Sequence, residues 1–281
     1  MTLQLRKATR RSVKIKVGLQ GPAGAGKTKS ALRIAYGITG DYAKIAVVDT
    51  ENRSSELYSD MGEFLVISLD APFTPERYIQ AIDLILKEAP EVEVIILDSV
   101  SAEWSGKGGI LEISNSMTGN SFTNWAKITP RHQAFVDKML NTDRHFIATV
   151  RSKQEYVLME KNGKQIPEKV GMAAVQREGM DYEYSLVFDI DIKHKATASK
   201  DRTGLFMDQP EATLTEETGQ RLREWANTGT DEVAEGIAAL RAADSLDSVM
   251  DVWNTNPLLH SNSDFKAAAS AARKRVETPI A

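Results

Sequence analysis

The stretch that decides the fold is VKIKVGLQGPAGAGKTKSALRIAYGI, residues 13–38. Val13–Leu19 alternates and is rich in β-branched residues, so it predicts a strand, and Lys29–Ile38 predicts a helix with Ala and Leu on one face. Between them Gly21–Thr28 reads GPAGAGKT, which fits the pattern G-x-x-x-x-G-K-[ST] in full. Because a phosphate-binding loop needs a strand before it and a helix after it, the sequence predicts a nucleotide site here.

The residue types in this loop explain the chemistry that it predicts. Three glycines let the backbone curl so that its N–H groups form an anion-binding nest, and the helix N-terminus adds positive potential. Lys27 can reach the terminal phosphates, and the Thr28 hydroxyl can ligate Mg²⁺. The predicted cofactor-binding residues of the loop are Gly21, Pro22, Ala23, Gly24, Ala25, Gly26, Lys27, Thr28 and Lys29.

Two later strands end in acidic residues. Val92–Leu97 (VEVIIL) is mostly apolar, as expected of a strand buried on both faces of a parallel sheet, and Asp98 follows it. A carboxylate at that edge can hold the water shell of Mg²⁺, or it can simply cap the next element. The strand Ala43–Val48 is followed by Asp49-Thr50-Glu51, where Glu51 can orient an attacking water or be a solvated surface charge.

The rest of the chain predicts an α/β core followed by helices. Strand and helix patterns alternate through the first 150 residues, and helical patterns dominate from Thr215 onward, so the predicted domains are 1–212 and 213–281. Further expected elements are a helix at Thr74–Lys87, a long loop at Ser105–Asn124, a helix at Pro130–Leu140, a strand at Phe146–Val150, a hairpin formed by Tyr156–Glu160 and Gln165–Val170, and strands at Tyr184–Ile192 and Gly204–Met207.

Composition excludes several classes of protein. Of the 281 residues, 42% are hydrophobic and 26% are charged, so the chain is not disordered as a whole. No apolar run approaches the roughly 20 residues of a membrane span, and no apolar stretch follows the basic residues of the first 16, so we expect no membrane association and an intracellular location. The absence of cysteine excludes disulfides, thiolate metal sites and cysteine nucleophiles. With a net charge of −4, any nucleic-acid surface must be a local patch.

Several segments together resemble the RecA family. Ile45–Asp60 (IAVVDTENRSSELYSD) resembles its strand that ends in an acidic pair, Val94–Trp104 (VIILDSVSAEW) its Asp-Ser metal strand, and His145–Tyr156 (HFIATVRSKQEY) its phosphate-sensing strand before a DNA-binding loop. Over about residues 12–207 the chain resembles the small RecA-like ATPases of phages and prophages, the Sak-type recombination ATPases. Other family-like segments are Trp125–Phe135, Lys169–Tyr184 and Ser199–Phe206.

The resemblance implies a RecA-like P-loop core with a mainly parallel sheet, a small helical C-terminal segment, and Mg²⁺-dependent ATP hydrolysis. It implies that Glu51 is the catalytic base and that Thr149 and Arg151 are candidates for the γ-phosphate sensor, a position where RecA-type enzymes commonly have Gln. Lys200 and Arg202 resemble the Lys-x-Arg element that reaches the nucleotide of a neighbouring subunit, which implies a ring or filament. A charged hairpin turn is the alternative for this pair.

Three regions are candidates for contact with single-stranded DNA, where cations meet phosphates and rings stack on bases. They are Ser105–Asn124 with Lys107 and Phe122, the basic arm Arg6–Lys16, and Arg151–Arg177. The last region carries Lys153, Tyr156, Lys161, Lys164, Lys169 and Arg177. Each alone is also typical of a solvated loop, but RecA-like proteins place DNA on the two loops that follow the metal strand and the sensor strand.

The resulting hypothesis is a DNA-stimulated ATPase of phage recombination or annealing in the cytoplasm of a bacterial host. One alternative is a nucleotide switch that controls assembly with a protein partner. A small-molecule kinase is disfavoured because Glu51 occupies a position suited to activating water and no Arg-rich lid pattern is present. Residues 213–281 predict either a helical bundle packed on itself or a docking module for a recombination partner.

Overall fold

The computed structural model groups the chain into two compact units, and the larger unit comprises Lys14–Trp225. The structure describes residues 12–161, 164–229 and 232–277, with the backbone alone for 154–161, 164–172 and 261. In these described ranges no helix is both long enough and apolar enough to cross a membrane.

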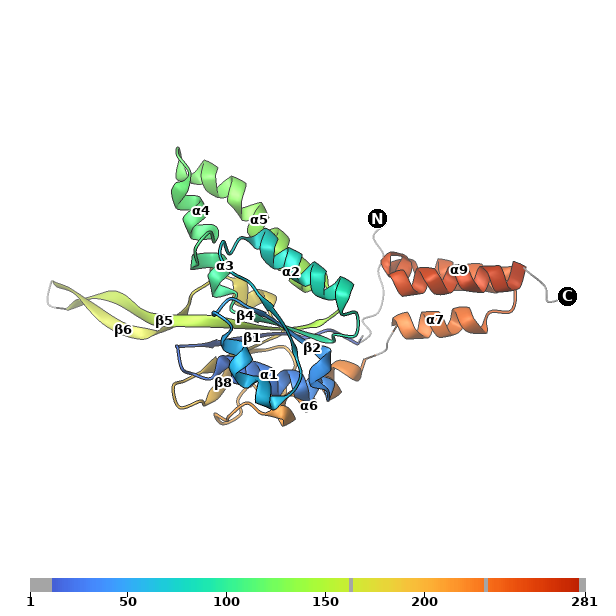
Figure 1. The fold of residues 1–281 in the computed structure, drawn as a ribbon, viewed down its shortest axis with the longest axis horizontal. Helices are drawn as coiled ribbons and strands as arrows, with labels where there is room; N and C mark the ends of the chain where they lie inside the picture. The colour runs from blue at the N-terminus through green and yellow to red at the C-terminus, as the bar shows by residue number, and fades with distance from the viewer. Residues whose placement is uncertain (1–11, 162–163, 230–231, 278–281) are drawn as a thin grey trace. The chain divides into compact units, whose positions relative to one another are not determined.

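A mainly parallel sheet forms the centre of the larger unit (Figure 1). Its strands run in the order β3-β2-β4-β5-β1-β7-β8, and β6 pairs with β5 alone. All neighbours are parallel except β7 with β8 and β5 with β6. The strands are β1 (Lys16–Gly21), β2 (Ile45–Asp49), β3 (Leu65–Ser68), β4 (Val94–Asp98), β5 (His145–Lys161), β6 (Lys164–Ala174), β7 (Leu186–Ile190) and β8 (Ala196–Asp201).

Helices cover both faces of this sheet, α2 and α5 on one face and α1 and α6 on the other (Figure 1). This arrangement confirms the predicted α/β class with a mainly parallel sheet and a helical C-terminal segment. The helices are α1 (Lys27–Thr39), α2 (Pro75–Glu88), α3 (Ser101–Ser105), α4 (Ile110–Ser116), α5 (Ser121–Asn141), α6 (Glu216–Asn227), α7 (Glu232–Ala242), α8 (Leu246–Thr255) and α9 (Ser263–Glu277). Short 3₁₀ turns are η1 (Tyr42–Lys44), η2 (Ser54–Met61), η3 (Met180–Glu183) and η4 (Pro257–Ser261).

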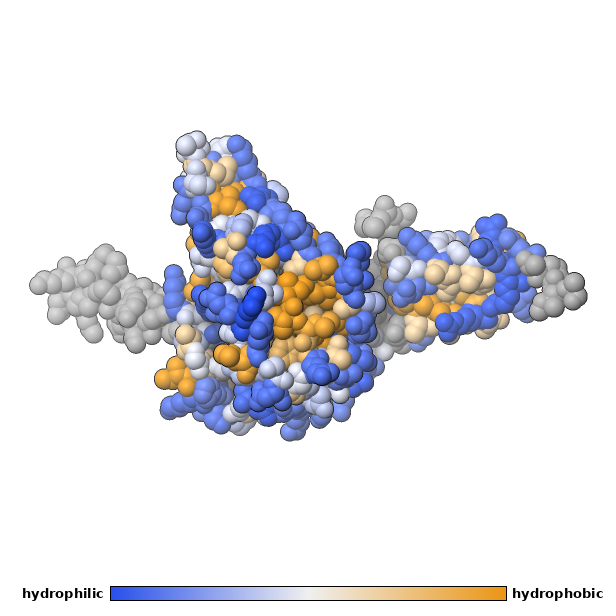
Figure 2. All heavy atoms as spheres, in the orientation of Figure 1, coloured by the Kyte–Doolittle hydropathy of each residue, from blue (hydrophilic) through white to orange (hydrophobic). Residues whose placement is uncertain are grey.

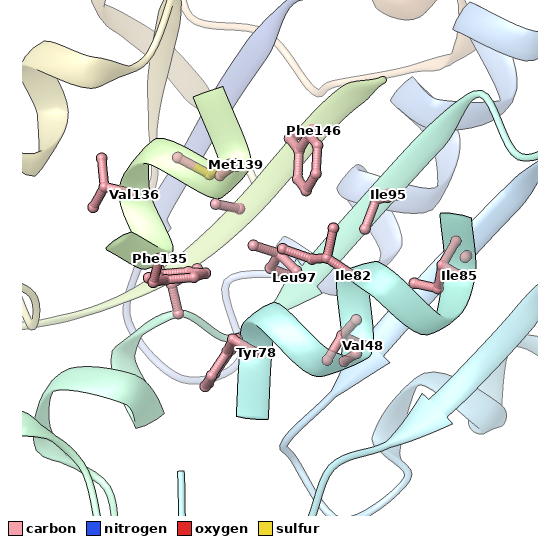
Figure 3. Packing of buried hydrophobic residues seen from close by; sticks show 14 of the residues in the cluster. Val48, Tyr78, Ile82, Ile85, Ile95, Leu97, Phe135, Val136, Met139 and Phe146 are labelled. Carbon is pink, nitrogen blue, oxygen red and sulfur yellow. The ribbon is translucent and has the colours of Figure 1, made fainter. Parts of the chain in front are cut away.

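The core under α2 and α5 explains the apolar strands (Figure 3). Ile95 and Leu97 of β4 face the side chains of Tyr78 and Ile82 from α2 and of Phe135 from α5, and all five are fully buried. The alternate strand positions, such as Val94 and Ile96, are equally buried toward the α1 face. Because both faces are covered, β4 needs apolar residues at every position rather than at every second one.

The region Ser105–Asn124 is largely helical, so the long loop expected there is wrong. It contains α4 and the first turn of α5, and α5 continues through Pro130 rather than starting there. The Asn120 side chain caps α5 by accepting a hydrogen bond from the N–H of Phe122, and Trp104 stacks on Trp125 at 5.9 Å between ring centroids. The cap and this tertiary contact stabilise helices that the Gly, Ser and Asn content disfavours locally.

The strand expected at Gly204–Met207 is also wrong, because β8 is the partner of β7. The Asp201 carboxylate explains why the chain turns after β8. It accepts hydrogen bonds from the backbone N–H groups of Thr203, Gly204, Phe206 and Met207, at 2.7–3.1 Å. These N–H groups are therefore not available for pairing with a neighbouring strand.

The expected hairpin in the middle of the chain is present and is longer than predicted. β5 runs past the end of the sheet and pairs with β6 from Ser152 opposite Ala174 to Lys161 opposite Lys164. Figure 1 shows this two-stranded ribbon extending beyond the central sheet. The hairpin therefore continues directly from the sheet strand that lies between β1 and β4.

Helix α6 packs against α1 through backbone contact. An added Cβ at Gly219 would lie 2.1 Å from the carbonyl oxygen of Ile34, and one at Gly37 would lie 2.0 Å from that of Glu216. Glu216 also forms a two-point ion pair with Arg33, at 2.8 and 2.7 Å. Contacts therefore place residues up to Trp225 with the sheet, whereas composition changes near residue 212.

The C-terminal helices α7, α8 and α9 have a core of their own. Phe265 and Leu240 are fully buried, and Trp253 stacks on His260 and Phe265 with centroids 3.9 and 5.6 Å apart. Figure 2 shows apolar residues along these helices bordered by hydrophilic ones. The apolar residues at helical spacing therefore serve first as the core of a small bundle.

We expect Gly219→Ala to destabilise the protein by about 1–3 kcal/mol, because the new methyl group must push α6 away from α1. The higher helix propensity of alanine, worth about 1 kcal/mol, opposes this loss only in part. Urea unfolding of the variant measures the effect. The control is Gln220→Ala, an exposed position on the same helix, for which we expect a change within about 0.5 kcal/mol. A Gly219→Ala variant as stable as the control would contradict close helix contact.

Candidate nucleotide site

The phosphate loop lies between β1 and α1, as its sequence predicts. Gly24 and Gly26 have φ values of 79° and 84°, a left-handed conformation that glycine adopts without steric cost. Gly26 is the N-cap of α1, so the N–H groups of the first helical turn face the loop. The Lys27 ammonium donates hydrogen bonds to the carbonyl oxygens of Gly21 and Pro22, each at 2.9 Å. The loop and its lysine line a cavity of about 870 Å³.

Asp98 lies at the floor of this cavity and is held by two hydroxyl groups. Thr28 donates a hydrogen bond to one carboxylate oxygen at 2.6 Å, and Thr149 of β5 donates to the other at 2.5 Å. Thr149 is fully buried, so the structure places it as a support for Asp98. Parallel pairing of β4 with β5 and of β5 with β1 brings these residues to the same edge of the sheet.

Glu51 lies in the same cavity and is oriented by two partners. Ser99 donates a hydrogen bond to Oε1 at 3.1 Å, and Arg151 donates to Oε1 at 2.8 Å and contacts Oε2 at 2.6 Å. Its neighbour Asp49 is buried and accepts hydrogen bonds from the backbone N–H groups of Glu51 and Ser55. Asp49 therefore shapes the turn after β2 and presents Glu51 to the cavity.

Burial and charge pairing shift the pKa values of the charged groups of the site in different directions. Burial raises the pKa of Asp98, although the hydrogen bonds from Thr149 and Thr28 oppose the shift. Burial also opposes ionisation of Glu51, but Arg151 and Ser99 outweigh it and lower the pKa of this carboxyl group. Desolvation lowers the pKa of Lys27, and the nearby Asp98 and Glu51 carboxylates counteract this shift. The site thus holds opposite charges that stabilise one another out of bulk water.

The oxygen atoms at the floor of the cavity suit Mg²⁺. A hydroxyl and a carboxylate, from Thr28 and Asp98, are hard ligands of the kind that Mg²⁺ takes from proteins when phosphates and water complete its shell. Among the described residues no cluster of three or more His, Cys, Asp or Glu side chains could hold a metal by itself. Magnesium would therefore be held here together with a bound nucleotide, with Lys27 beside its phosphates.

Lys29 and Arg151 also line the cavity, whereas the predicted finger lies elsewhere. Lys200 donates hydrogen bonds to the carbonyl oxygens of Asp181 and Tyr182, and Arg202 donates to that of Tyr182. Among the described residues that line the cavity, neither Lys200 nor Arg202 is present.

The candidate DNA contacts lie in different surroundings. Lys107 and Lys153 are exposed, and Phe122 is 88% exposed at the start of α5. Lys16 is buried and donates to the carbonyl oxygens of Thr142 and Arg144, so this part of the predicted basic arm cannot contact DNA. Burial lowers its pKa to about 7. Outside the described residues or side chains lie Arg6, Lys7, Arg10, Arg11, Tyr156, Lys161, Lys164 and Lys169.

Sequence reasoning missed several residues of the cavity. Arg33 lies one turn along α1 from the loop, and His194, Thr213 and Leu214 come from segments after β7. Helical spacing from Lys29 could have indicated Arg33. His194 belongs to no motif, and only the pairing of β1 with β7 brings it to the loop.

Comparisons with known proteins identify the family of the chain. Residues 13–223 match the family model described as AAA domain. Among solved structures, a KaiC-like protein from the hyperthermophilic archaeon Pyrococcus horikoshii is similar, with 16% identity, 71% of this chain and 82% of that chain covered, and a TM-score of 0.36. No curated protein matches the chain. The family match spans the phosphate loop, Glu51, Asp98 and most of α6, and the chain therefore belongs to the AAA-domain family of P-loop ATPases.

Proposed function

We propose that the protein hydrolyses ATP in a Mg²⁺-dependent reaction and that single-stranded DNA stimulates this reaction. The observation that carries the proposal is the meeting of four groups in one cavity: the Lys27 ammonium, the Thr28–Asp98 pair and the Glu51 carboxylate. A loop that only bound phosphate would not need a second carboxylate facing the same cavity. Glu51 is the group that suits this reaction, because it can accept a proton from water.

Different residues of the chain bind the phosphates and activate the water molecule. Lys27 and the N–H groups at the start of α1 bind the phosphates and stabilise the negative charge that develops during transfer. Glu51, oriented by Ser99, orients a water molecule and takes its proton. Thr28 and Asp98 would hold Mg²⁺, which would supply charge neutralisation at the phosphate oxygens.

Arg151 links Glu51 to the β5–β6 hairpin. Its side chain contacts both oxygens of Glu51, so Arg151 competes with a water molecule for this carboxylate. A γ-phosphate is a competing anion for the same guanidinium group. We therefore assign Arg151 as the phosphate sensor, with Thr149 supporting Asp98. Since Arg151 immediately precedes the hairpin in β5, a ligand on the hairpin can influence the same contact.

DNA recombination or annealing is the process that the sequence resemblance favours, for a phage- or prophage-encoded protein in a bacterial cytoplasm. Two described features support a DNA surface. The β5–β6 hairpin continues the sensor strand and carries the exposed Lys153 near its start, and the helical segment after the metal strand presents the exposed Phe122. Cations and rings of this kind suit a single strand. We also propose that the protein acts together with a recombination partner protein.

We propose self-association into a ring or filament, on the basis of the resemblance of Lys200 and Arg202 to the Lys-x-Arg element. These cations lie in or next to β8, which ends the sheet, and are bonded to carbonyl oxygens outside the phosphate cavity. Because Lys200 and Arg202 do not line the cavity of their own protomer, the anionic ligand proposed for them is the nucleotide of a neighbouring protomer. We propose that they act on that nucleotide.

ATP turnover with and without single-stranded DNA tests the proposed function. We expect stimulation by DNA, and we expect Glu51→Gln to lower turnover by about a hundredfold or more while nucleotide still binds, because the amide cannot accept the proton. ATP turnover that does not change when single-stranded DNA is added would refute the proposed stimulation by DNA. Turnover that survives in Glu51→Gln within a few-fold would show that Glu51 only shapes the site.

The pH dependence of kcat/KM tests the pairing of Arg151 with Glu51. Arg151 lowers the pKa of Glu51 in the nucleotide-free site, and Glu51 must be ionised to act, so in Arg151→Ala the pKa of Glu51 rises and the acid limb of kcat/KM, which reports the free enzyme, moves to higher pH. The control is Arg144→Ala, next to the other end of β5, which should leave the acid limb in place. An acid limb that stays fixed or moves to lower pH in Arg151→Ala contradicts the pairing.

Mixing two inactive variants tests action between protomers. Glu51→Gln and Arg202→Ala should recover part of the activity together, because some interfaces combine Glu51 from one subunit with Arg202 from the next. A mixture of Lys27→Ala with Glu51→Gln is the control and should stay inactive, since every site then lacks Lys27 or Glu51. If the first mixture also stays inactive although subunits are shown to exchange, the assignment of Arg202 fails.

A further inference from the structure

The turn between β7 and β8 lies against the phosphate loop at two points. At the end of β7, the carbonyl oxygen of Ile190 would be 2.5 Å from a Cβ added to Gly21. Further along the turn, the His194 ring lies 3.0 Å from the carbonyl oxygen of Ala25, measured at Nδ1, and would be 3.1 Å from a Cβ on Gly26. The loop is therefore enclosed between β1 and a turn 169 residues further along the chain.

The backbone of this turn holds His194 in place. The Asp191 carboxylate accepts hydrogen bonds from the N–H groups of Lys193 and Lys195, both at 2.8 Å, and the His194 N–H donates to the Asp191 carbonyl at 3.1 Å. His194 itself has a φ of 63°, which is uncommon for a residue with a side chain. This conformation directs the imidazole toward the loop rather than along the strand.

The partner of His194 determines which ring nitrogen carries hydrogen. A carbonyl oxygen accepts hydrogen bonds and does not donate them, so Nδ1 must be the N–H group that bonds to Ala25. Ala25 is itself fully buried, and its N–H bonds to the carbonyl of Pro22 at 3.3 Å. His194 thus bonds to the loop at a residue that is fixed from both sides.

His194 also lines the cavity that contains the phosphate loop. Glu51, Asp98 and Arg151 mark the part of this cavity where the terminal phosphate would react. His194, Thr213 and Leu214 complete its wall from the segments after β7. A nucleotide seated on the loop therefore lies within a wall to which the β7–β8 turn contributes.

We propose that His194 is a positioning residue for nucleotide binding, which it performs by holding the phosphate loop in its curled form through the bond from Nδ1 to the Ala25 carbonyl. This inference rests on the proposed nucleotide site and extends it to a residue outside every motif of the sequence. The ligand class is a nucleoside di- or triphosphate. Because the bond is made to the loop and not to the transferring phosphate, His194 acts on binding more than on the chemical step.

Three variants test the proposal by titration with a fluorescent ADP analogue and by kcat and KM for ATP. His194→Gly removes the ring and tolerates the positive φ, and we expect about five- to tenfold weaker binding, the effect of about one lost hydrogen bond, with KM raised more than kcat is lowered. His194→Asn tolerates the same φ and places an amide N–H near the position of Nδ1, so we expect recovery to within about threefold of the wild-type affinity. The control is Lys193→Ala, an exposed neighbour on the turn, which should bind normally.

Two results would overturn the inference while the proposed function stands. One is a His194→Gly protein that binds as tightly as the wild type, and the other is a His194→Asn protein that binds no better than His194→Gly. The Lys27→Ala variant tests separately whether the loop is the nucleotide site. If Lys27→Ala binds the analogue as well as the wild type does, the loop is not the nucleotide site, and the proposed function and the role of His194 both fall.

Discussion

The buried carboxylate of Asp98 is the group on which the geometry of the site depends. Its two oxygens accept hydrogen bonds from Thr28, at the start of α1, and from Thr149, in β5. Its backbone carbonyl accepts a hydrogen bond at 2.7 Å from the N–H of Thr50, next to Glu51. One residue at the end of β4 thereby fixes the segments that carry the phosphate loop, the second carboxylate and the sensor strand. Burial raises the pKa of Asp98, so its ionised form needs these hydroxyl groups or a bound cation as partners.

Charge pairing determines how the rest of the site is arranged around this carboxylate. Two acids, Asp98 and Glu51, share the cavity with Lys27 and Arg151. Asp98 and Glu51 counteract the lowering of the Lys27 pKa by burial, and Arg151 lowers the pKa of Glu51. Arg151 engages both oxygens of Glu51, and it stands where β5 leaves the sheet for the hairpin with β6. The base of the site is therefore in direct contact with the root of the hairpin. This contact connects the nucleotide cavity to the surface to which we assign DNA.

The β7–β8 hairpin provides a second connection. Its turn places His194 on the phosphate loop, and the far end of β8 carries Lys200 and is followed by Arg202. The hairpin thus contacts a protomer's own loop at one end and presents cations on its outside at the other. A hairpin placed in this way can relate the state of one nucleotide site to the position of groups proposed to act on the next.

The sequence by itself determined the phosphate loop, the α/β class and the two acidic strand ends, because each depends on local patterns. Gly24 and Gly26 provide the positive φ values that the loop requires. The continuous apolar run of β4 reflects burial on both faces of the sheet. Asp98 and Glu51 follow strands whose carboxyl ends meet at one edge of the sheet. Only the tertiary structure decided which groups pair. The contacts of Glu51 with Arg151 and of Ala25 with His194 span 100 and 169 residues, and no periodicity encodes a contact at such a distance along the chain. For the same reason α4 and the start of α5 could not be predicted, since ring stacking of Trp104 on Trp125 compensates for a composition that locally favours loops.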